Sequence, residues 1–152
     1  MHDVVVVGAG PSGSYAAFRC SRYGLDTLLL EKEKLPRTKA CGGAASKDII
    51  SYLGKEVMEV VEHEGQGNHL FFDYREIGVL ERRALFFRRE NFDYFITELA
   101  ENAGCKVMDR ERVTSILVEN DSCEVRTERR TYSSRIVIGA EHLHEGLPLP
   151  GG

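Results

Sequence analysis

Hydrophobic residues near the start of the chain form a short unbroken run that ends at a cluster of glycines. Residues 3–7 hold four consecutive valines, a pattern that predicts a β-strand buried on both faces. A turn over residues 8–13 follows. Pro11 suits the first turn of a helix, because proline lacks the N–H group that would be unpaired there. The sequence therefore predicts a strand, a tight turn and a helix in direct succession.

A second strand follows this helix. We expect the helix to reach about Tyr23, with Gly24 directly after its C-terminus, where glycine is favoured. Residues 27–30 are apolar and end at Glu31. A strand, a crossover helix and a second strand are typical of a parallel βαβ unit.

The middle of the chain departs from the strand–helix alternation of a plain nucleotide-binding domain. A basic loop over residues 32–39 leads to Cys41-Gly42-Gly43. We expect a short helix over 46–53, ended by Gly54, and then antiparallel strands over 69–72, 77–80 and 84–87. This stretch predicts a small antiparallel insertion.

The clearest helical pattern lies in residues 91–103. Its apolar residues recur at i, i+3, i+4, i+7, i+8 and i+11 and form one face: Phe92, Phe95, Ile96, Leu99, Ala100 and Ala103. We expect Asn91 to cap this helix and Gly104 to end it. Residues 106–108 then predict a parallel strand beside the first two.

The last part of the sequence predicts a β-meander and a final strand. Residues 113–118 and 123–127 form a hairpin around the Asn120-Asp121 turn, and 131–132 extend it. Residues 135–139 are a last apolar strand. Together these patterns predict an α/β fold, a Rossmann-like domain with a parallel sheet, a small antiparallel insertion and a β-meander.

Composition narrows the class of protein. The 152 residues fit one domain, and a net charge of −4 with a pI near 5.8 argues against a nucleic-acid binder. No apolar run approaches the roughly 18 residues of a membrane span, and the N-terminus lacks a signal-peptide pattern. The four cysteines are scattered, which suits a reducing cytosol rather than a disulfide framework or a zinc site. We expect a cytoplasmic protein without a metal.

Gly8, Gly10 and Gly13 carry the sharpest chemical signal, because they follow a strand and open a helix. Gly8 permits a tight turn, Gly10 leaves the backbone open to a pyrophosphate, and Gly13 lets the helix approach the sheet. Pro11 and Ser12 lie in the first helical turn, whose N–H groups and dipole favour phosphate. The pattern predicts a dinucleotide site.

Glu31 supplies the second half of this signal. It lies 18 positions after Gly13, at the end of the second strand, where a ribose-binding carboxylate is expected. Its oxygens can accept charge-assisted hydrogen bonds from ribose hydroxyls, whereas a 2′-phosphate there would meet like charge. We therefore predict binding of the ADP half of a dinucleotide other than NADP. The long insertion after Glu31 and the β-meander argue against a plain NAD-binding domain.

Five segments resemble the FAD-dependent geranylgeranyl reductase family, within the flavoprotein group that includes aromatic hydroxylases and flavin-dependent halogenases. They are DVVVVGAGPSG (3–13), LLLEK (28–32), PRTKACGG (36–43), RENFD (89–93) and IVIGA (136–140). The PRTKACGG segment is the most particular to the reductases. The resemblance covers about residues 3–140 and implies FAD as the cofactor. Members of this family use a reduced flavin to saturate double bonds of isoprenoid chains.

The resemblance also implies roles for individual residues. Gly8, Gly10 and Gly13 hold the pyrophosphate, and Glu31 holds the adenosine ribose. The other implied contacts are those of Lys32 with adenine and ribose, Arg37 and Cys41-Gly42-Gly43 with the ribityl chain or flavin ring, Arg89 with the cofactor, and Val113 with adenine through its backbone. For the complete protein, the resemblance implies an isoprenoid lipid substrate, an electron donor for the flavin and peripheral membrane contact.

Several of these residues have plainer interpretations. Arg37 lies in a basic loop that is solvated by default, and Arg89 can be an ordinary surface charge. Cys41 can be only a small residue before a glycine turn, since nothing in the sequence shows a lowered thiol pKa. His142 and His144 lack companion ligands, which favours a flexible tail over a metal pair.

The chain departs from the family after Ala140. Where the family continues with Asp-Gly, this sequence has Glu141-His142, and residues 141–152 have the composition of a disordered tail. The family's later Gly-Asp motif and substrate-walling sheet domain have no counterpart. We therefore expect an incomplete FAD-binding domain over 1–140, the N-terminal part of a longer reductase. Such a chain alone lacks the enclosure that catalysis needs.

Three functions stay open on the sequence alone. The leading one is an FAD-dependent oxidoreductase of the geranylgeranyl reductase type. The second is another flavin enzyme on the same scaffold, a monooxygenase or halogenase, because a fold does not settle the chemistry. The third is a non-catalytic dinucleotide-binding module.

Overall fold

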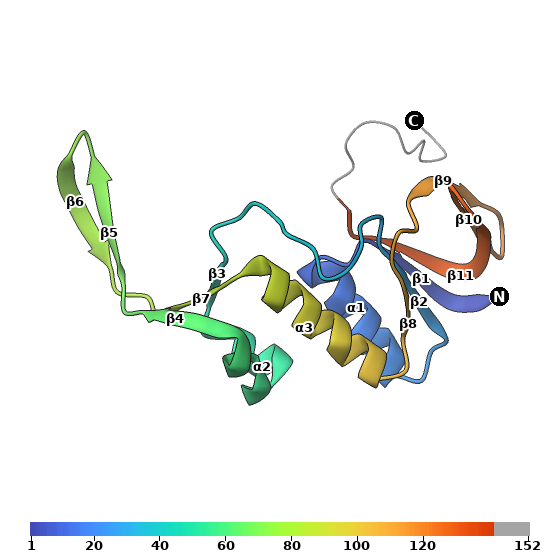
Figure 1. Ribbon diagram of the computed structural model, residues 1–152, viewed down its shortest axis with the longest axis horizontal. Coiled ribbons are helices and arrows are strands. Elements are labelled where there is room, and N and C mark those ends of the chain that lie inside the picture. Colours follow the sequence, from blue (N-terminus) through green and yellow to red (C-terminus); the bar gives the residue numbers. More distant parts are fainter. Residues whose placement is uncertain (142–152) are drawn as a thin grey trace. The chain divides into compact units, whose positions relative to one another are not determined.

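The computed structural model describes residues 1–141, so the expectations for residues 142–152, including His142 and His144, lie outside it. Contacts divide the chain into two compact units, residues 1–37 with residues from 96 onward, and residues 38–95. Figure 1 labels the elements of both. Within residues 1–141 no helix is both long and apolar enough to cross a bilayer.

A six-stranded sheet forms the first unit, in the order β8-β2-β1-β11-β10-β9 (Figure 1). The strands are β1 (His2–Val7), β2 (Thr27–Leu30), β8 (Lys106–Met108), β9 (Val113–Val118), β10 (Cys123–Thr127) and β11 (Thr131–Gly139). β8, β2, β1 and β11 pair in parallel, whereas β10 pairs antiparallel with both neighbours. The predicted parallel sheet and β-meander are confirmed, although β11 is one strand where the sequence predicts two segments.

The valine run of β1 is buried on both faces of this sheet, as its sequence predicts. Val5 and Val6 have no exposed surface. One face of the sheet packs against helix α1 (Pro11–Arg22), through a cluster that includes Val4, Val6, Ala17, Leu29 and Ala100. The other face contains Val5, Val7, Leu28, Leu30, Val113 and Val125. The core therefore fixes the C-terminal ends of β1 and β2, which lie side by side because these strands are parallel neighbours.

The second unit contains two small antiparallel sheets, one in the order β3-β7-β4 and the other the hairpin β5–β6. Its strands are β3 (Ala44–Ser46), β4 (Val61–Gly65), β5 (Asn68–Phe72), β6 (Arg75–Leu80) and β7 (Ala84–Phe87). Helix α2 (Ile49–Leu53) and the 3₁₀ helix η1 (Lys55–Val60) lie between β3 and β4 in the sequence. Helix α3 (Arg89–Asn102) begins in this unit and continues into the first. The predicted antiparallel insertion is confirmed.

The hairpin β5–β6 turns at Asp73 and Tyr74, which have φ angles of 47° and 60°. Two consecutive residues of positive φ are typical of the tight turns that match the twist of paired strands. Every residue of β5 is exposed, and so is most of β6. The exposed large hydrophobic residues of the hairpin are Leu70, Phe71, Phe72, Tyr74, Ile77, Val79 and Leu80.

Two details of the second unit differ from the sequence prediction. The helix expected over residues 46–53 begins only at Ile49, because Ala44–Ser46 pairs with β7 instead. β4 is not predicted by its sequence, since Val61–Gly65 reads Val-Glu-His-Glu-Gly with a single large apolar residue. Both differences arise because β7 offers hydrogen-bonding edges to short segments on either side.

The prediction that Asn91 caps the long helix is wrong. Arg89 is the first residue of α3, and the Phe92 N–H already donates to the Arg88 carbonyl at 3.0 Å. The earlier start is favoured by an ion pair between Arg89 and Asp93, four positions apart on one helix face. The predicted apolar face is otherwise present, with Phe92, Ile96 and Ala100 buried.

Candidate functional site

The glycine turn between β1 and α1 is shaped by contacts that exclude side chains. Gly8 has a φ of 102°, in the region that favours glycine, and its N–H donates to the Leu30 carbonyl at 2.7 Å. A Cβ on Gly13 would overlap the carbonyl oxygen of Gly8. The turn can therefore close only with glycine at these positions, which fits the tight approach that a pyrophosphate requires.

Helix α1 begins directly after this turn. Gly10 is its N-cap and Pro11 its first residue, and Ser12 is exposed in the first turn. That turn contains no acidic side chain. The unpaired N–H groups and the positive dipole end therefore remain available to an anion.

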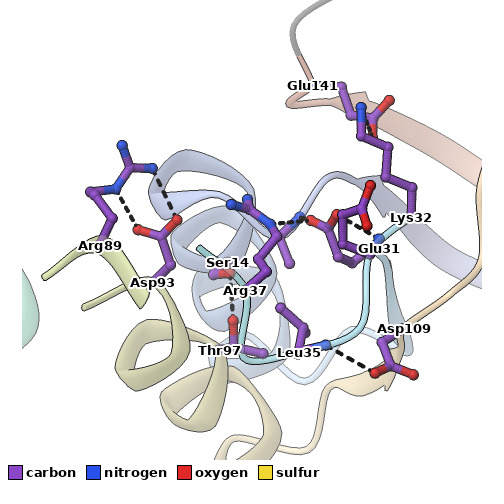
Figure 2. Close-up of polar contacts among 12 residues, drawn as sticks. Ser14, Glu31, Lys32, Leu35, Arg37, Arg89, Asp93, Thr97, Asp109 and Glu141 are labelled. Carbon is purple, nitrogen blue, oxygen red and sulfur yellow. Dashed lines mark hydrogen bonds and ion pairs between the residues drawn. The ribbon is translucent and has the colours of Figure 1, made fainter. Parts of the chain in front are cut away.

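The Glu31 carboxylate lies at the glycine turn, with only 2% of the residue exposed. Its Oε2 accepts the Ala9 N–H at 2.9 Å, and its Oε1 accepts the Glu33 N–H at 3.1 Å. Figure 2 shows the carboxylate beside the turn, at the end of β2. The two motifs that the sequence analysis singled out separately are therefore one hydrogen-bonded arrangement.

Arg37 completes this cluster, because its guanidinium lies beside Glu31 and Gly10. Its Nε lies 3.2 Å from the Glu31 Oε2, and its side chain is only 13% exposed (Figure 2). A Cβ on Gly10 would lie 3.7 Å from the Arg37 Nη2. The guanidinium therefore lies beside the Glu31 carboxylate and the glycine turn, and its expected contact with the ribityl chain or flavin ring stays a prediction.

Lys32 and Glu141 approach each other from the ends of β2 and β11. The Lys32 Nζ lies 3.8 Å from the Glu141 Oε1 (Figure 2). A Cβ on Gly8 would lie 2.9 Å from the Glu141 Cγ. Sequence analysis assigned Glu141 to the tail. Its place at the site follows from the pairing of β11 with β1, which puts Ala140 and Glu141, the two residues after β11, next to Gly8.

Val113 is the first residue of β9 and is 8% exposed. The loop before it is attached to the end of β2, because the Glu111 N–H donates to the Glu31 carbonyl at 2.9 Å. The backbone expected to meet adenine is therefore connected to the residue expected to meet ribose by a short, hydrogen-bonded segment.

Cys41, Gly42, Gly43 and Arg89 belong to the second unit. Gly43 has a φ of 65°, its carbonyl accepts the Phe87 N–H at 2.8 Å, and a Cβ there would overlap the Phe87 carbonyl oxygen. Glycine is therefore required at Gly43. A Cβ on Gly42 would meet nothing within 4 Å, so space alone does not require glycine there.

Arg89 is held by Asp93, a carboxylate that is 1% exposed. Its Nε and Nη2 donate to the two Asp93 oxygens at 2.7 and 2.9 Å, and this bidentate pair raises the pKa of Arg89 (Figure 2). Hydrogen bonding from the Gly43 N–H, and then from Arg89, lowers the pKa of the exposed Cys41 thiol. Asp93 was not among the predicted site residues, although its i+4 spacing from Arg89 is visible in the sequence.

Comparison with known proteins agrees with this geometry. The sequence profile of a family described as FAD dependent oxidoreductase matches residues 3–143. A digeranylgeranylglycerophospholipid reductase from Methanococcoides burtonii is 33% identical over 168 residues, covering 92% of this chain and 37% of the relative. This chain spans only 37–39% of the length of this reductase and of a second one, from Methanosphaera stadtmanae.

Solved structures give the same result. A crystal structure described as geranylgeranyl bacteriochlorophyll reductase-like, from Thermoplasma acidophilum, superimposes with a TM-score of 0.80 at 28% identity, over 92% of this chain and 39% of the other. A myxobacterial chondrochloren halogenase, a variant of FAD-dependent halogenases, has a TM-score of 0.77 at 23% identity, over 92% of this chain and 37% of its own. At that identity the halogenase shows a shared fold only.

These matches confirm three predictions: the Rossmann-like α/β fold, the resemblance to geranylgeranyl reductases, and FAD as the cofactor. The glycine turn, where a Cβ on Gly8 or Gly13 would clash, and the carboxylate held beside it fit the ADP part of that cofactor. Because the profile covers most of the chain, this protein belongs to the FAD-dependent oxidoreductase family.

Proposed function

We propose that this chain provides the ADP-binding part of a flavoenzyme that reduces double bonds in isoprenoid lipids. The observation that carries the proposal is the buried Glu31 carboxylate, held at the glycine turn by the Ala9 N–H at 2.9 Å. When bound, FAD supplies the hydride chemistry. The residues of this chain bind and orient it.

In the first unit, backbone N–H groups and charged side chains bind different parts of the ADP moiety. The turn and the N-terminus of α1 receive the pyrophosphate, and Glu31 accepts hydrogen bonds from the ribose hydroxyls. Arg37, 3.2 Å from Glu31 and close to Gly10, adds a positive charge at the junction of ribose and pyrophosphate. Lys32 lies beside the ribose end.

The residues that the resemblance assigns to the flavin belong to the second unit. Arg89 is fixed by two hydrogen bonds to Asp93, so its guanidinium is preorganised to meet the cofactor. The Cys41-Gly42-Gly43 turn presents an exposed thiol with a lowered pKa. We assign these residues to positioning the flavin and give Cys41 no reactive role.

The reductase assignment, rather than a halogenase or monooxygenase, is supported by relatives that are about 30% identical to this chain. Those relatives are digeranylgeranylglycerophospholipid reductases, whereas the halogenase likeness is one of fold. The proposal includes an isoprenoid lipid substrate, an external electron donor and contact of the complete enzyme with a membrane surface from the cytoplasmic side.

Titration of the purified chain with FAD tests the binding part. We expect Glu31→Ala to weaken FAD binding by about ten- to a hundredfold, since it removes charge-assisted hydrogen bonds. Glu33→Ala is the matched control, because the Glu33 side chain is 57% exposed and only its backbone N–H touches Glu31. Binding of NADH but not FAD would reject the cofactor assignment, and an unchanged affinity would remove Glu31 from the site.

A chimera tests the reductase part. This chain would replace the matching N-terminal segment of the Methanococcoides burtonii reductase, and lipid reduction would be followed by mass spectrometry. We expect the chimera to bind FAD and to add two hydrogens per double bond. A chimera that binds FAD normally but leaves the lipid unchanged would count against an isoprenoid reductase.

A further inference from the structure

Glu111 is a buried carboxylate that the proposed function leaves without a role. It lies in the loop between β8 and β9 and is 3% exposed. The Thr127 hydroxyl donates to its Oε2 at 2.7 Å, and the Arg130 Nε lies 3.9 Å from its Oε1. Burying a carboxylate is costly unless it is well bonded, so this residue holds its surroundings in one arrangement.

The backbone of this loop is attached to the segment after β2. The Glu111 N–H donates to the Glu31 carbonyl at 2.9 Å, and the Arg110 N–H donates to the Glu33 carbonyl at 3.3 Å. On the same side, the Leu35 N–H donates to the Asp109 carboxylate at 3.0 Å (Figure 2). The loop is therefore hydrogen-bonded to the segment that begins with Glu31.

The side chain of Glu111 attaches the same loop to the β10–β11 turn. Thr127 organises that turn, since its hydroxyl oxygen accepts the N–H groups of Arg129 at 3.2 Å and Arg130 at 2.9 Å. The Glu128 N–H also donates to the Arg112 carbonyl at 3.1 Å. Val113 follows Arg112 and pairs with Thr127, where the pairing of β9 with β10 shifts its register.

The charge of Glu111 also acts on Tyr132. Burial, and then the negative charge of Glu111, raises the pKa of Tyr132.

We propose that Glu111 is a positioning residue that fixes the Val113 backbone relative to the Glu31 carboxylate, and so makes the site select adenine over other purines. The inference rests on the proposed function and on the role that the family resemblance implies for Val113, which is to pair with adenine through its backbone. Adenine presents a donor at position 6 and an acceptor at N1, whereas hypoxanthine presents an acceptor and a donor at the same places. A backbone held in one position can match only one of these patterns.

Calorimetric titration of the full chain with ADP and with inosine diphosphate tests this role. We expect the parent protein to prefer ADP, and Glu111→Ala to reduce that preference by about five- to twentyfold, the scale of one or two hydrogen bonds. Glu111→Gln should retain most of the preference, because its amide oxygen can still accept the Thr127 hydroxyl. Glu128→Gln, an exposed carboxylate on the same turn, is the control.

Two further measurements separate this inference from the proposed function. Thr127→Val keeps a β-branched side chain but removes the donor to Glu111, so it should lower the preference for ADP even if Glu111→Ala fails to fold. Glu31→Ala should weaken both nucleotides equally. If Glu111→Ala and Thr127→Val leave the ratio of ADP to inosine diphosphate affinity unchanged, the inference is overturned. A parent protein that binds neither nucleotide would overturn the proposed function as well.

Discussion

The first unit and the β5–β6 hairpin of the second unit use their hydrophobic residues in opposite ways. In the first unit, the valines of β1 are at most 3% exposed and lie between two packed faces. In the second, Phe72 and Ile77 of the hairpin are 73% and 67% exposed. Side chains are held in fixed positions where a packed core lies behind them. Glu31 and the glycine turn are held by strand ends that the core fixes, whereas the hairpin has only its own two strands to hold it.

The largest effect that we predict comes from adding one methyl group to a glycine of each unit. We expect Gly13→Ala to reduce FAD affinity by more than about a hundredfold, because its Cβ would overlap the Gly8 carbonyl oxygen and force the turn open. Gly78→Ala in the hairpin is the matched control, since a Cβ there meets nothing within 4 Å. Fluorescence titration with FAD measures both. Comparable affinities for the two variants would mean that the turn does not bind the pyrophosphate.

The same contrast applies to folding stability. Leu29 is completely buried in the first unit, and we expect Leu29→Ala to lower the free energy of unfolding by about 2–5 kcal/mol. Leu70 in the hairpin is 41% exposed, so Leu70→Ala should change the free energy of unfolding by less than about 0.5 kcal/mol. Urea unfolding followed by circular dichroism gives both values. A larger loss at Leu70 would show that the hairpin is packed in solution.

The secondary structure of the first unit was easier to predict from the sequence than that of the second. The βαβ unit was predictable because a run of four valines has no stable place except a strand buried on both faces, and because the phosphate turn depends on glycine itself. Strands β3 and β4 were not predictable, because their sequences carry little β signal and they form only where β7 offers an edge. In those segments tertiary pairing outweighs local preference.

The positions of some candidate site residues were predictable from the sequence, and those of others were not. Glu31 was predictable from its spacing, since the length of α1 fixes where the next strand ends. The approach of Arg37 to Glu31 was not, because it depends on the path of an irregular loop. Glu111 carried no signal at all. A glutamate in a charged loop is usually solvated, and its burial depends on the β10–β11 turn folding over it.

The smallest effect that we predict compares one thiol from each unit. The Gly43 N–H and then Arg89 lower the pKa of Cys41, whereas burial raises the pKa of Cys105 to about 11. A lowered pKa gives more thiolate at pH 8, so Cys41 should react with iodoacetamide well before Cys105. Arg89→Met should slow the reaction of Cys41 with iodoacetamide by roughly two- to fivefold. The effect is small because the hydrogen bond from the Gly43 N–H, which lowers the pKa more, remains. Lys47→Met, whose ammonium pairs with Glu64, is the control. Peptide mapping by mass spectrometry follows each cysteine separately, and equal rates for Cys41 and Cys105 in the folded protein would contradict the placement of the two thiols.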